Sequence, residues 1–422
     1  IVTDVRTGER IRLDEVGARQ EVYVQGIDEE WHTATGRITH WIHNGKKPVW
    51  EVRLRNGAHI KTTVDHHYLT EEGWKPLGEL KIGDYIATPR ALIPQNETFD
   101  RRKLRLLAYL LADGDLGNLA AVNFVSKDPA LLTEYERCLE VFEDTAPGHV
   151  EQVRGVTRVT VAKSDRNDYH APNQLLAWLR ELGLKHPAGS KPGGVRSAEK
   201  FVPDFVFALS PEDIAYFLAS LWDCDGYAGH KLWHYKTISA QLAEDVQTLL
   251  LKLGISSYIY TATYKSQRGA RTSYQVTVYD TARLAEVLRP YLLTAKRNVP
   301  ATTHTLGDIA RVPFIAEVEA ATSLSKRALM REFGIDRQHF YTKGRQRARI
   351  AATVVAPLTE RLSLPETTRR LRIAWEEIVS IEAAGVEDVY DITVEGLHNF
   401  VANNIIVHNC VYQEQIMQIA VA

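Results

Sequence analysis

The run His408-Asn409-Cys410, near the end of the chain, places three residue types with different chemistry side by side after an apolar segment. The side-chain amide nitrogen of Asn409 can attack the backbone carbonyl carbon of the same residue, which forms a five-membered succinimide and cuts the chain after Asn409. Cys410 can attack an upstream acyl group as a thiolate. His408 can donate a hydrogen bond or a proton to the carbonyl oxygen that gains charge. A strand end that carries these residues by chance is the alternative, so the rest of the chain has to decide.

Two apolar segments, 102–115 and 215–226, are predicted to be helices, and each has an Asp-Gly pair near its end. Asp113 and Asp225 are 112 residues apart, a spacing that indicates two copies of one αββαββα-sized unit. Small residues on each segment allow the helices to approach closely, which brings the two carboxylates together. Carboxylates repel unless a cation lies between them, and carboxylate, water and phosphate oxygens are the ligands that Mg²⁺ prefers. A buried helix with a terminal Asp explains one copy easily, but two copies are hard to dismiss.

Length and composition limit the class of protein. A chain of 422 residues exceeds the size of one growing core, so two or three domains are expected. The net charge of −2 argues neither for nor against nucleic acid, so any DNA-binding surface has to be local. Three cysteines are too few for a disulfide framework or a zinc cluster and fit a reducing cytosol. Since no apolar run has the length of a membrane span and no signal peptide is visible, we expect a cytoplasmic monomer without membrane contact.

The elements that must position the His-Asn-Cys run are short strands at both ends of the chain. Residues 1–95 and 375–409 combine β-branched and aromatic residues with turn signals, which predicts all-β structure. Asn56-Gly57 lies between two alternating runs and predicts a type I′ hairpin. From about residue 98 the pattern changes to helices, including an amphipathic helix over 242–255. The expected strands are 22–24, 36–41, 49–54, 378–381, 389–394 and 399–402.

The two helical copies resemble the LAGLIDADG homing endonucleases, through 218–226 (LASLWDCDG) and, more loosely, 106–114 (LLAYLLADG). The resemblance covers about residues 100–300. It implies an α+β endonuclease with pseudo-twofold repeats, in which Asp113 and Asp225 hold Mg²⁺ and the protein makes a staggered cut in a long double-stranded DNA site. It also implies a lysine near the scissile phosphate. Lys200 matches that lysine, and Lys296 is a further candidate for the second half, although a lone lysine is more often a solvated surface residue.

The β segments resemble the splicing domain of inteins. Thr63, followed by His66 three residues later, is similar to the N-terminal splicing motif, while 389–401 and 404–410 are similar to the last two motifs. The resemblance implies a horseshoe-like, all-β HINT domain. By this resemblance, Thr63 and His66 polarise the first scissile amide, and Asp391 activates the junction cysteines. His398 assists the Asn409 side chain, and His408 assists succinimide formation. Asn409 is then the last residue of the intein and Cys410 the first residue of the downstream flank.

Together the resemblances imply an endonuclease inserted into a loop of a splicing domain, where it disturbs the host fold least. The first amide becomes a thioester on an N-terminal cysteine, Cys410 captures the upstream flank, Asn409 cyclises, and an S-to-N shift restores a peptide bond without any cofactor. Ile1 departs from this pattern, because such families begin with Cys or Ser. We therefore expect a fragment whose first nucleophile lies upstream. The predicted domains are 1–95 and 373–409 (splicing), 96–305 (endonuclease), 306–372 (helical insert) and 410–422 (downstream flank).

The insert is required by neither resemblance. Residues 324–333 predict a helix, 334–335 a turn and 336–341 a second helix, which together look like a helix-turn-helix. Between residues 321 and 350 lie eight Lys and Arg residues against two acidic ones. A solvated helical hairpin that bridges two domains is an equally good interpretation. The candidate DNA-binding residues are Lys326, Arg327, Arg337, Lys343 and Arg345.

The tail 411–420 (VYQEQIMQIA) resembles a segment of the catalytic α subunit of bacterial DNA polymerase III, which would make the tail a flank from that host. Two classes of function stay open at this point. The first is a splicing protein that carries a DNA endonuclease. The second is a DNA-binding regulator or endonuclease whose HINT-like flanks are only structural. Intact carboxylates also allow a nuclease half that binds DNA without cutting it.

Overall fold

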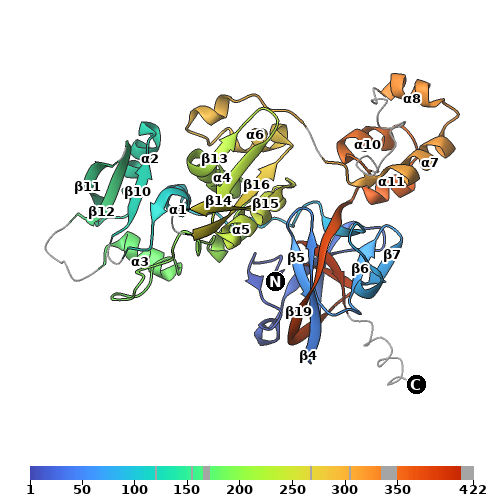
Figure 1. The fold of residues 1–422 in the computed structure, drawn as a ribbon, viewed down its shortest axis with the longest axis horizontal. Coiled ribbons are helices and arrows are strands. Elements are labelled where there is room, and N and C mark those ends of the chain that lie inside the picture. The colour runs from blue at the N-terminus through green and yellow to red at the C-terminus, as the bar shows by residue number, and fades with distance from the viewer. Residues whose placement is uncertain are drawn as a thin grey trace. The chain divides into compact units, whose positions relative to one another are not determined.

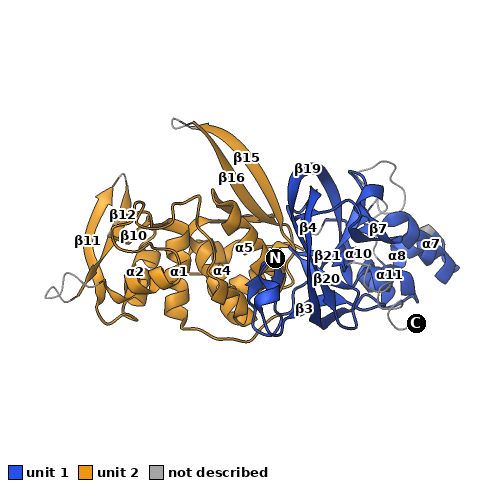
Figure 2. Ribbon diagram, turned by 90° about the horizontal axis from the view of Figure 1, so that it is seen from below, with its two compact units in different colours: residues 1–93, 305–422 blue, residues 94–304 orange. Residues whose placement is uncertain are grey.

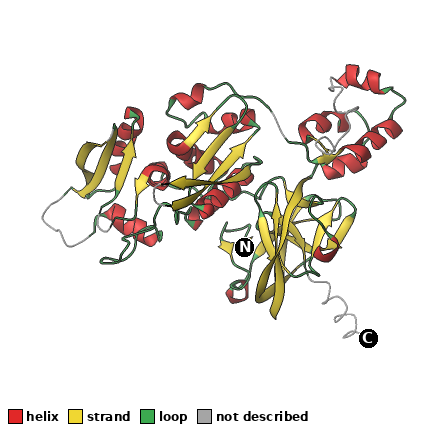
Figure 3. Ribbon diagram, in the orientation of Figure 1, coloured by secondary structure: helices red, strands yellow, loops and turns green. Residues whose placement is uncertain are grey.

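The computed structural model describes residues 1–118, 121–153, 155–164, 172–266, 269–303, 306–333 and 349–409. The chain forms two compact units, coloured separately in Figure 2 and traced in chain order in Figure 1. Unit 1 consists of residues 1–93 and 305–422, and unit 2 of residues 94–304. Unit 1 is mostly strands apart from one helical segment, whereas unit 2 mixes helices and strands (Figure 3). Within the described ranges, no helix has both the length and the apolar character to cross a membrane.

The β-rich part of unit 1 is built from both ends of the sequence. Its strands are β1 Val2–Thr3, β2 Arg10–Ile11, β3 Tyr23–Ile27, β4 Thr33–Leu54, β5 His59–Thr62, β6 His67–Thr70, β7 Gly73–Pro76, β8 Tyr85–Pro89, β19 Ile373–Val394, β20 Asn399–Ala402 and β21 Ile405–His408. One five-stranded sheet has the order β3-β4-β19-β8 with β5 on β4, and a four-stranded sheet has the order β20-β21-β6-β7. Since β19 pairs with β4 and β8, and β21 with β6, the two predicted all-β segments form a single body.

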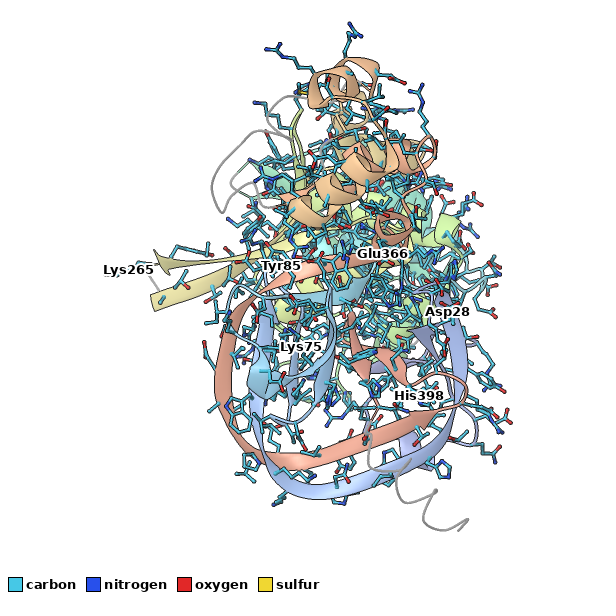
Figure 4. The ribbon with its side chains drawn as sticks, turned by 90° about the vertical axis from the view of Figure 1, so that its right-hand side faces the viewer. Asp28, Lys75, Tyr85, Lys265, Glu366 and His398 are labelled. Carbon is cyan, nitrogen blue, oxygen red and sulfur yellow. The ribbon has the colours of Figure 1, made fainter. Side chains whose placement is uncertain are left out.

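Two strands of this body are much longer than predicted. The segments 36–41 and 49–54 both lie in β4, and the segments 378–381 and 389–394 both lie in β19, so the prediction of separate strands was wrong. The sequence around Gly45 looks like a turn in isolation. However, β19 pairs with β4 on both sides of it, and Gly45 is accommodated inside the strand at φ +73°. Register shifts in this pairing mark bulges, which bend the two strands side by side (Figure 4).

The hairpin predicted at Asn56-Gly57 is present, but it is not type I′. Leu54 N donates to Ala58 O and Gly57 N donates to Leu54 O, so three residues form the loop between β4 and β5. Only Gly57 has a positive φ, +96°, whereas a type I′ turn needs two such residues. The strand register therefore selects a turn that ends in a left-handed glycine.

Unit 2 contains the predicted internal duplication. The first copy consists of α1 Arg101–Asp113, β9 Gly114–Asp115, β10 Asn123–Ser126, α2 Pro129–Leu139, β11 Thr145–Val153, β12 Val156–Lys163 and α3 Gln174–Glu181. The second consists of α4 Pro211–Asp225, β13 Gly226–Ala228, β14 Trp233–Thr237, α5 Ala240–Lys252, β15 Tyr258–Ser266, β16 Gly269–Val278 and α6 Thr281–Leu288. Both follow the order αββαββα, and their sheets, β11-β12-β10-β9 and β15-β16-β14-β13, have matching strand orders. The two copies share one hydrophobic core.

The remaining part of unit 1 is a helical segment between residues 306 and 372. It contains β17 Ile309–Ala310, α7 Arg311–Ala321, α8 Lys326–Phe333, β18 Arg349–Ile350, α10 Ala352–Thr359 and α11 Pro365–Arg370. α8 agrees with the first predicted helix, which was expected to begin two residues earlier. The second predicted helix, 336–341, lies outside the described residues, so the helix-turn-helix stays a prediction.

Candidate functional site

Local sequence fixes where α1 and α4 begin and end. The Asp100 carboxylate accepts hydrogen bonds from Arg102 N and Lys103 N at the start of α1, and the Ser210 hydroxyl accepts one from Asp213 N at the start of α4. Each helix ends at its aspartate, and a glycine follows as the C-terminal cap. A Cβ at Gly114 would lie 2.5 Å from Leu110 O, and one at Gly226 would lie 2.6 Å from Trp222 Cα. The glycine of each Asp-Gly pair is therefore required where the helix turns into a strand.

The helices α1 and α4 pack against each other, as predicted. Ala108 on α1 and Ser220 on α4 have no exposed surface. The Ser220 hydroxyl donates to Tyr216 O at 2.9 Å and accepts from Arg105 Nε at 3.2 Å. Arg105 is itself buried and also donates to Glu134 and to Tyr291 O. Each of its three guanidinium nitrogens therefore donates a hydrogen bond inside unit 2. This network fixes the helix pair whose C-terminal ends carry Asp113 and Asp225.

One lysine donates hydrogen bonds to the carbonyls at the C-terminal end of each helix. Lys200 Nζ donates to Leu110 O, Ala112 O and Gly114 O at 2.9–3.1 Å. Lys296 Nζ donates to Trp222 O, Asp223 O and Cys224 O at 2.6, 2.8 and 3.2 Å. Lys200 therefore caps the C-terminal end of α1, and Lys296 caps that of α4 in the same way. The sequence left the two lysines as unequal candidates, but their geometry makes them equivalent.

The two carboxyl groups of this centre, Asp113 and Asp225, are harder to ionise than in water. Burial, together with the neighbouring Asp225 carboxylate, raises the pKa of Asp113 to about 6. Burial also raises the pKa of Asp225, and it lowers the pKa of Lys200 to about 8 and the pKa of Lys296 below its ordinary value. In the described ranges no group of three or more His, Cys, Asp and Glu residues could hold a metal ion. Two adjacent carboxylates nevertheless fit Mg²⁺, which commonly takes one or two carboxylates with water and phosphate oxygens.

Removing either lysine tests the equivalence of the two halves. We expect Lys200→Met and Lys296→Met each to lower the melting temperature by a few degrees, since each removes three hydrogen bonds to carbonyls at a helix end. Each variant should also lower the rate of DNA cutting at least about tenfold, because the aspartates follow these carbonyls directly. Thermal unfolding and plasmid cutting measure both effects, with exposed Lys127→Met as the control. A loss confined to one lysine variant contradicts the equivalence.

An ion pair links the N-terminal ends of the same helices. Arg101 Nε donates to Asp213 Oδ1 at 2.8 Å, and Asp213 Oδ2 accepts from Phe99 N at 3.1 Å. Arg101 is 112 residues before Asp213, which is also the spacing between Asp113 and Asp225. Arg101 and Asp213 therefore occupy matching positions of the two copies and contact each other.

In unit 1, a tight hairpin delivers His408 and Asn409. Asn403 and Asn404, between β20 and β21, both have positive φ, +48° and +62°, which is the conformation that a two-residue hairpin loop needs. Asn403 Nδ2 also donates to His59 O at 3.0 Å. Val407 pairs with Tyr68 of β6, so β21 is held on both sides immediately before the His-Asn pair.

His408, Asn409 and His398 come together at the end of β21. Asn409 is buried, and its N–H donates to His398 O at 3.1 Å. His408 Nδ1 lies 2.5 Å from Asn409 O, the carbonyl oxygen of the peptide bond that would be cut. The centroids of the His398 and His408 rings lie 6.4 Å apart with the rings nearly parallel, and the Trp74 ring packs edge-on against His408 with 4.7 Å between centroids. The imidazole of His408 is therefore placed to polarise the scissile carbonyl.

The residues assigned to the upstream junction lie in a neighbouring pocket. Thr63, His66 and Asp391 line this pocket of about 390 Å³ together with Asn403 and Val407. His66 is half-buried, but its Nε2 atom is enclosed and has no hydrogen-bond partner among the described residues. Asp391 is buried, and its carboxylate accepts from Ile392 N at 2.8 Å. The structure thus groups Thr63, His66 and Asp391, whereas His398 lines a different pocket.

The enclosed His66 makes stability depend on pH. Burial and the charges of His408 and His67 lower the pKa of His66 from 6.5 to about 4. The unfolded chain therefore binds more protons than the folded chain between pH 6.5 and pH 4, and stability falls as pH decreases through this window. We expect His66 to lower the unfolding free energy by about 3 kcal/mol at most over that range. Urea unfolding of wild type and His66→Gln at several pH values measures this, and identical pH slopes would contradict it.

The predicted residues outside these clusters are only partly described. Arg327 is exposed on α8, and Lys326 begins the same helix, without a description of its side chain. Cys410, the tail 411–420 and the candidate DNA-binding residues Arg337, Lys343 and Arg345 lie outside the described residues, so their roles stay predictions.

Two residues that contact the cluster of His398, His408 and Asn409 or its strand were not predicted from the sequence. The first is Trp74, whose ring contacts His408. The second is Asn399, whose Oδ1 accepts from Ile27 N and whose Nδ2 donates to Ile27 O, each at 2.8 Å. A usable signal was present for Asn399, because a buried amide in an apolar strand next to His398 needs partners for both of its ends.

Comparison with known proteins agrees with this arrangement. The family described as intein splicing domain matches residues 4–409. A replicative DNA helicase DnaB from Synechocystis sp. is 30% identical over 458 residues, which cover 98% of this chain and 49% of that protein. The DnaB helicase of Rhodothermus marinus is also 30% identical, over 96% of this chain and 45% of its own length. The chain thus spans about half the length of the curated relatives that it matches.

Solved structures give weaker likenesses. A mutant of the Ssp DnaB mini-intein variant M86 has a TM-score of 0.30 at 14% identity, with 97% of this chain and 94% of that chain covered. Variants of the homing endonuclease I-DmoI have a TM-score of 0.32 at 13% identity, with 44% and 94% covered. Both TM-scores are too low to support a function. The family match, in contrast, covers nearly the whole chain, including every described residue of the His398, His408 and Asn409 cluster, and the chain therefore belongs to the family of intein splicing domains.

Proposed function

We propose that this chain removes itself from a precursor by protein splicing, with cyclisation of Asn409 and transesterification to Cys410. The observation that carries the proposal is the 2.5 Å approach of His408 Nδ1 to Asn409 O, next to a buried Asn409. A precursor with the natural flanks on both sides tests it. Joined flanks and a free excised chain support splicing, whereas an uncut precursor would favour the alternative in which the β domain is only structural.

The residues of this chain account for the downstream cleavage. The Asn409 side-chain nitrogen bonds to the Asn409 carbonyl carbon, the bond from that carbon to the nitrogen of residue 410 breaks, and the leaving amine takes a proton. His408, facing the carbonyl oxygen, stabilises the charge that develops there. Hydrogen bonding of Asn409 N to His398 O holds the residue in place for the attack. Thr63, His66 and Asp391 are proposed to act at the upstream junction, since they line one pocket.

We also propose that unit 2 is a site-specific endonuclease for double-stranded DNA. The paired Asp113 and Asp225, with the helix carbonyls before them capped by Lys200 and Lys296, carry this proposal. The two aspartates would hold Mg²⁺, which when bound offsets the charge of phosphate oxygens and generates a nucleophilic water. Metal-dependent cutting of a plasmid that carries the uninterrupted host site tests the proposal. DNA binding without cutting in the presence of Mg²⁺ would favour a decayed nuclease.

The helical segment 306–372 is proposed to add DNA affinity through its basic residues, including Lys326 and Arg327. A cationic element should make DNA binding weaken with increasing salt. Deletion of 321–350 should reduce both the affinity and the slope of its salt dependence. Unchanged values for both quantities would exclude this role.

The host is proposed to be a replication protein. The segment 411–420 resembles the catalytic α subunit of bacterial DNA polymerase III, which makes this subunit our proposed host, whereas the relatives reported above are DnaB helicases. The coding sequence on both sides of this segment decides between these hosts.

A further inference from the structure

The helix α11 of the helical segment is fixed by a carboxylate from α7. Glu317 accepts hydrogen bonds from Glu366 N and Thr367 N, each at 2.9 Å, and from the Thr367 hydroxyl at 2.5 Å. Thr367 is fully buried. Because one carboxylate satisfies the free N–H groups at the start of this short helix, α11 is locked to α7 rather than left as a loose connection.

Two arginines, one on α11 and one just after it, contact the turn that joins β3 to β4. Arg369 donates to Glu29 O at 2.7 Å, and its guanidinium lies 4.2 Å from the ring centre of Trp31. Arg372, just after α11, donates to Glu30 O at 2.5 Å. Trp31 has a φ of +65°, a conformation that a bulky side chain rarely adopts, so the turn needs support from its surroundings. The arginines supply that support from outside the β domain.

The strand that leads into this turn, β3, is connected to the downstream junction. Ile27, the last residue of β3, forms the reciprocal pair of hydrogen bonds with the Asn399 side chain. Asn399 pairs with His408 in the β20–β21 ladder, and the preceding residue, His398, accepts the hydrogen bond from Asn409 N. A series of short contacts therefore runs from Glu317 through α11 and the β3–β4 turn to Asn409.

A pocket of about 640 Å³ lies along this series and is lined by Arg369 of α11, by the β3–β4 turn and by residues around His398. Glu29, Trp31 and Arg369 form one part of the lining, and Trp74, His398 and Asn399 form the other; Asp28 and His398, labelled in Figure 4, both belong to it. The helical segment thus contributes a side chain to the surroundings of His398, a residue of the downstream junction.

We propose that Arg369 is a positioning residue for cleavage after Asn409, and that α11 is thereby a part of the splicing centre. The inference rests on the proposed splicing function and adds a role for the helical segment besides DNA binding. Arg369 does not touch the reacting atoms. It holds the β3–β4 turn, the turn holds Asn399, and Asn399 keeps β20 in register with His408. Since Asn409 must reach its own carbonyl carbon in one particular geometry, a shift of the order of 1 Å would slow cyclisation strongly.

The test uses the full chain with a reporter protein fused after Ala422, and a precursor with its natural upstream flank. We expect Arg369→Ala to slow release of the reporter about tenfold. Upstream cleavage by an added thiol should change less than about twofold, because Thr63, His66 and Asp391 line a different pocket. Arg369→Lys retains a cation over Trp31 and a donor for Glu29 O, and should restore most of the release rate.

Two further variants keep the test decisive. Arg361→Ala is the matched control, since Arg361 stacks on Phe333 within the helical segment and has no described contact with the β3–β4 turn. Glu317→Gln loosens α11 without altering any residue of the β domain and should slow release about threefold, even if Arg369→Ala fails to fold. Wild-type release rates for both Arg369→Ala and Glu317→Gln, or equal slowing of upstream and downstream cleavage, would overturn the inference. Failure of the wild-type chain itself to release the reporter would instead count against the splicing function.

Discussion

Replacing Asn409 with alanine is expected to abolish release of a reporter fused after Ala422. The side-chain amide nitrogen of Asn409 is the only nucleophile that can form the five-membered ring at this carbonyl, so its removal leaves water as the attacking group. We expect the rate to fall by at least about a thousandfold, the scale on which an intramolecular attack exceeds a bimolecular one. Gel analysis of the fused precursor over time measures the release.

A graded set of variants separates the roles in this cluster. Asn96→Ala removes an exposed amide at a distant position in the sequence and should leave release unchanged. His408→Ala removes the ring 2.5 Å from the scissile carbonyl oxygen and should slow release about a hundredfold, the usual cost of losing one donor to a developing oxyanion. Release of the reporter at the wild-type rate by Asn409→Ala would rule out cyclisation as the cleavage step.

Substitution of Asp113 or Asp225 with asparagine is expected to eliminate DNA cutting while making the metal-free protein more stable. Burial and the Asp225 carboxylate raise the pKa of Asp113 to about 6, so the carboxyl is still mostly ionised at neutral pH, but its charge costs more free energy in the folded chain than in the unfolded chain. Removing that charge should increase the unfolding free energy in EDTA by roughly 1–2 kcal/mol. Because this charge is one of the two that we propose to hold Mg²⁺, cutting should drop at least about a thousandfold.

The measurements for this prediction are plasmid cutting and urea unfolding with EDTA or with Mg²⁺. Wild type should gain stability from Mg²⁺, whereas Asp113→Asn should gain much less, since the ion binds only the folded pair of carboxylates. Asp128→Asn, at the N-cap of α2, is the control for a carboxylate outside the centre, because asparagine caps a helix about as well as aspartate. Cutting by Asp113→Asn or Asp225→Asn at the wild-type rate would refute the assignment of the metal site.

Residue patterns predicted which side chains the fold brings together better than they predicted the strands. The Asp-Gly ends of α1 and α4 could be recognised because local sequence determines where a helix stops. The length of β4 could not be predicted, because the sequence around Gly45 looks like a turn. Pairing with β19, more than 300 residues away in the sequence, is what makes this segment a continuous strand. The equivalence of Lys200 and Lys296 was also missed, because the two lysines are 96 residues apart rather than 112, although a Val-Pro pair follows both of them, at 202–203 and 299–300. Only the folded chain brings each lysine to its helix end.

Arg101 and Asp213 carry a consequence for how such a duplicated protein can be assembled. In a homodimer of the first copy this position would bring two arginines face to face, and in a homodimer of the second copy it would bring together two aspartates, of which Asp213 is almost completely buried. Either arrangement is repulsive, whereas the mixed pair forms an ion pair. The halves have thus diverged into complementary partners, and severing the linker between them should yield fragments that recombine only as one of each kind.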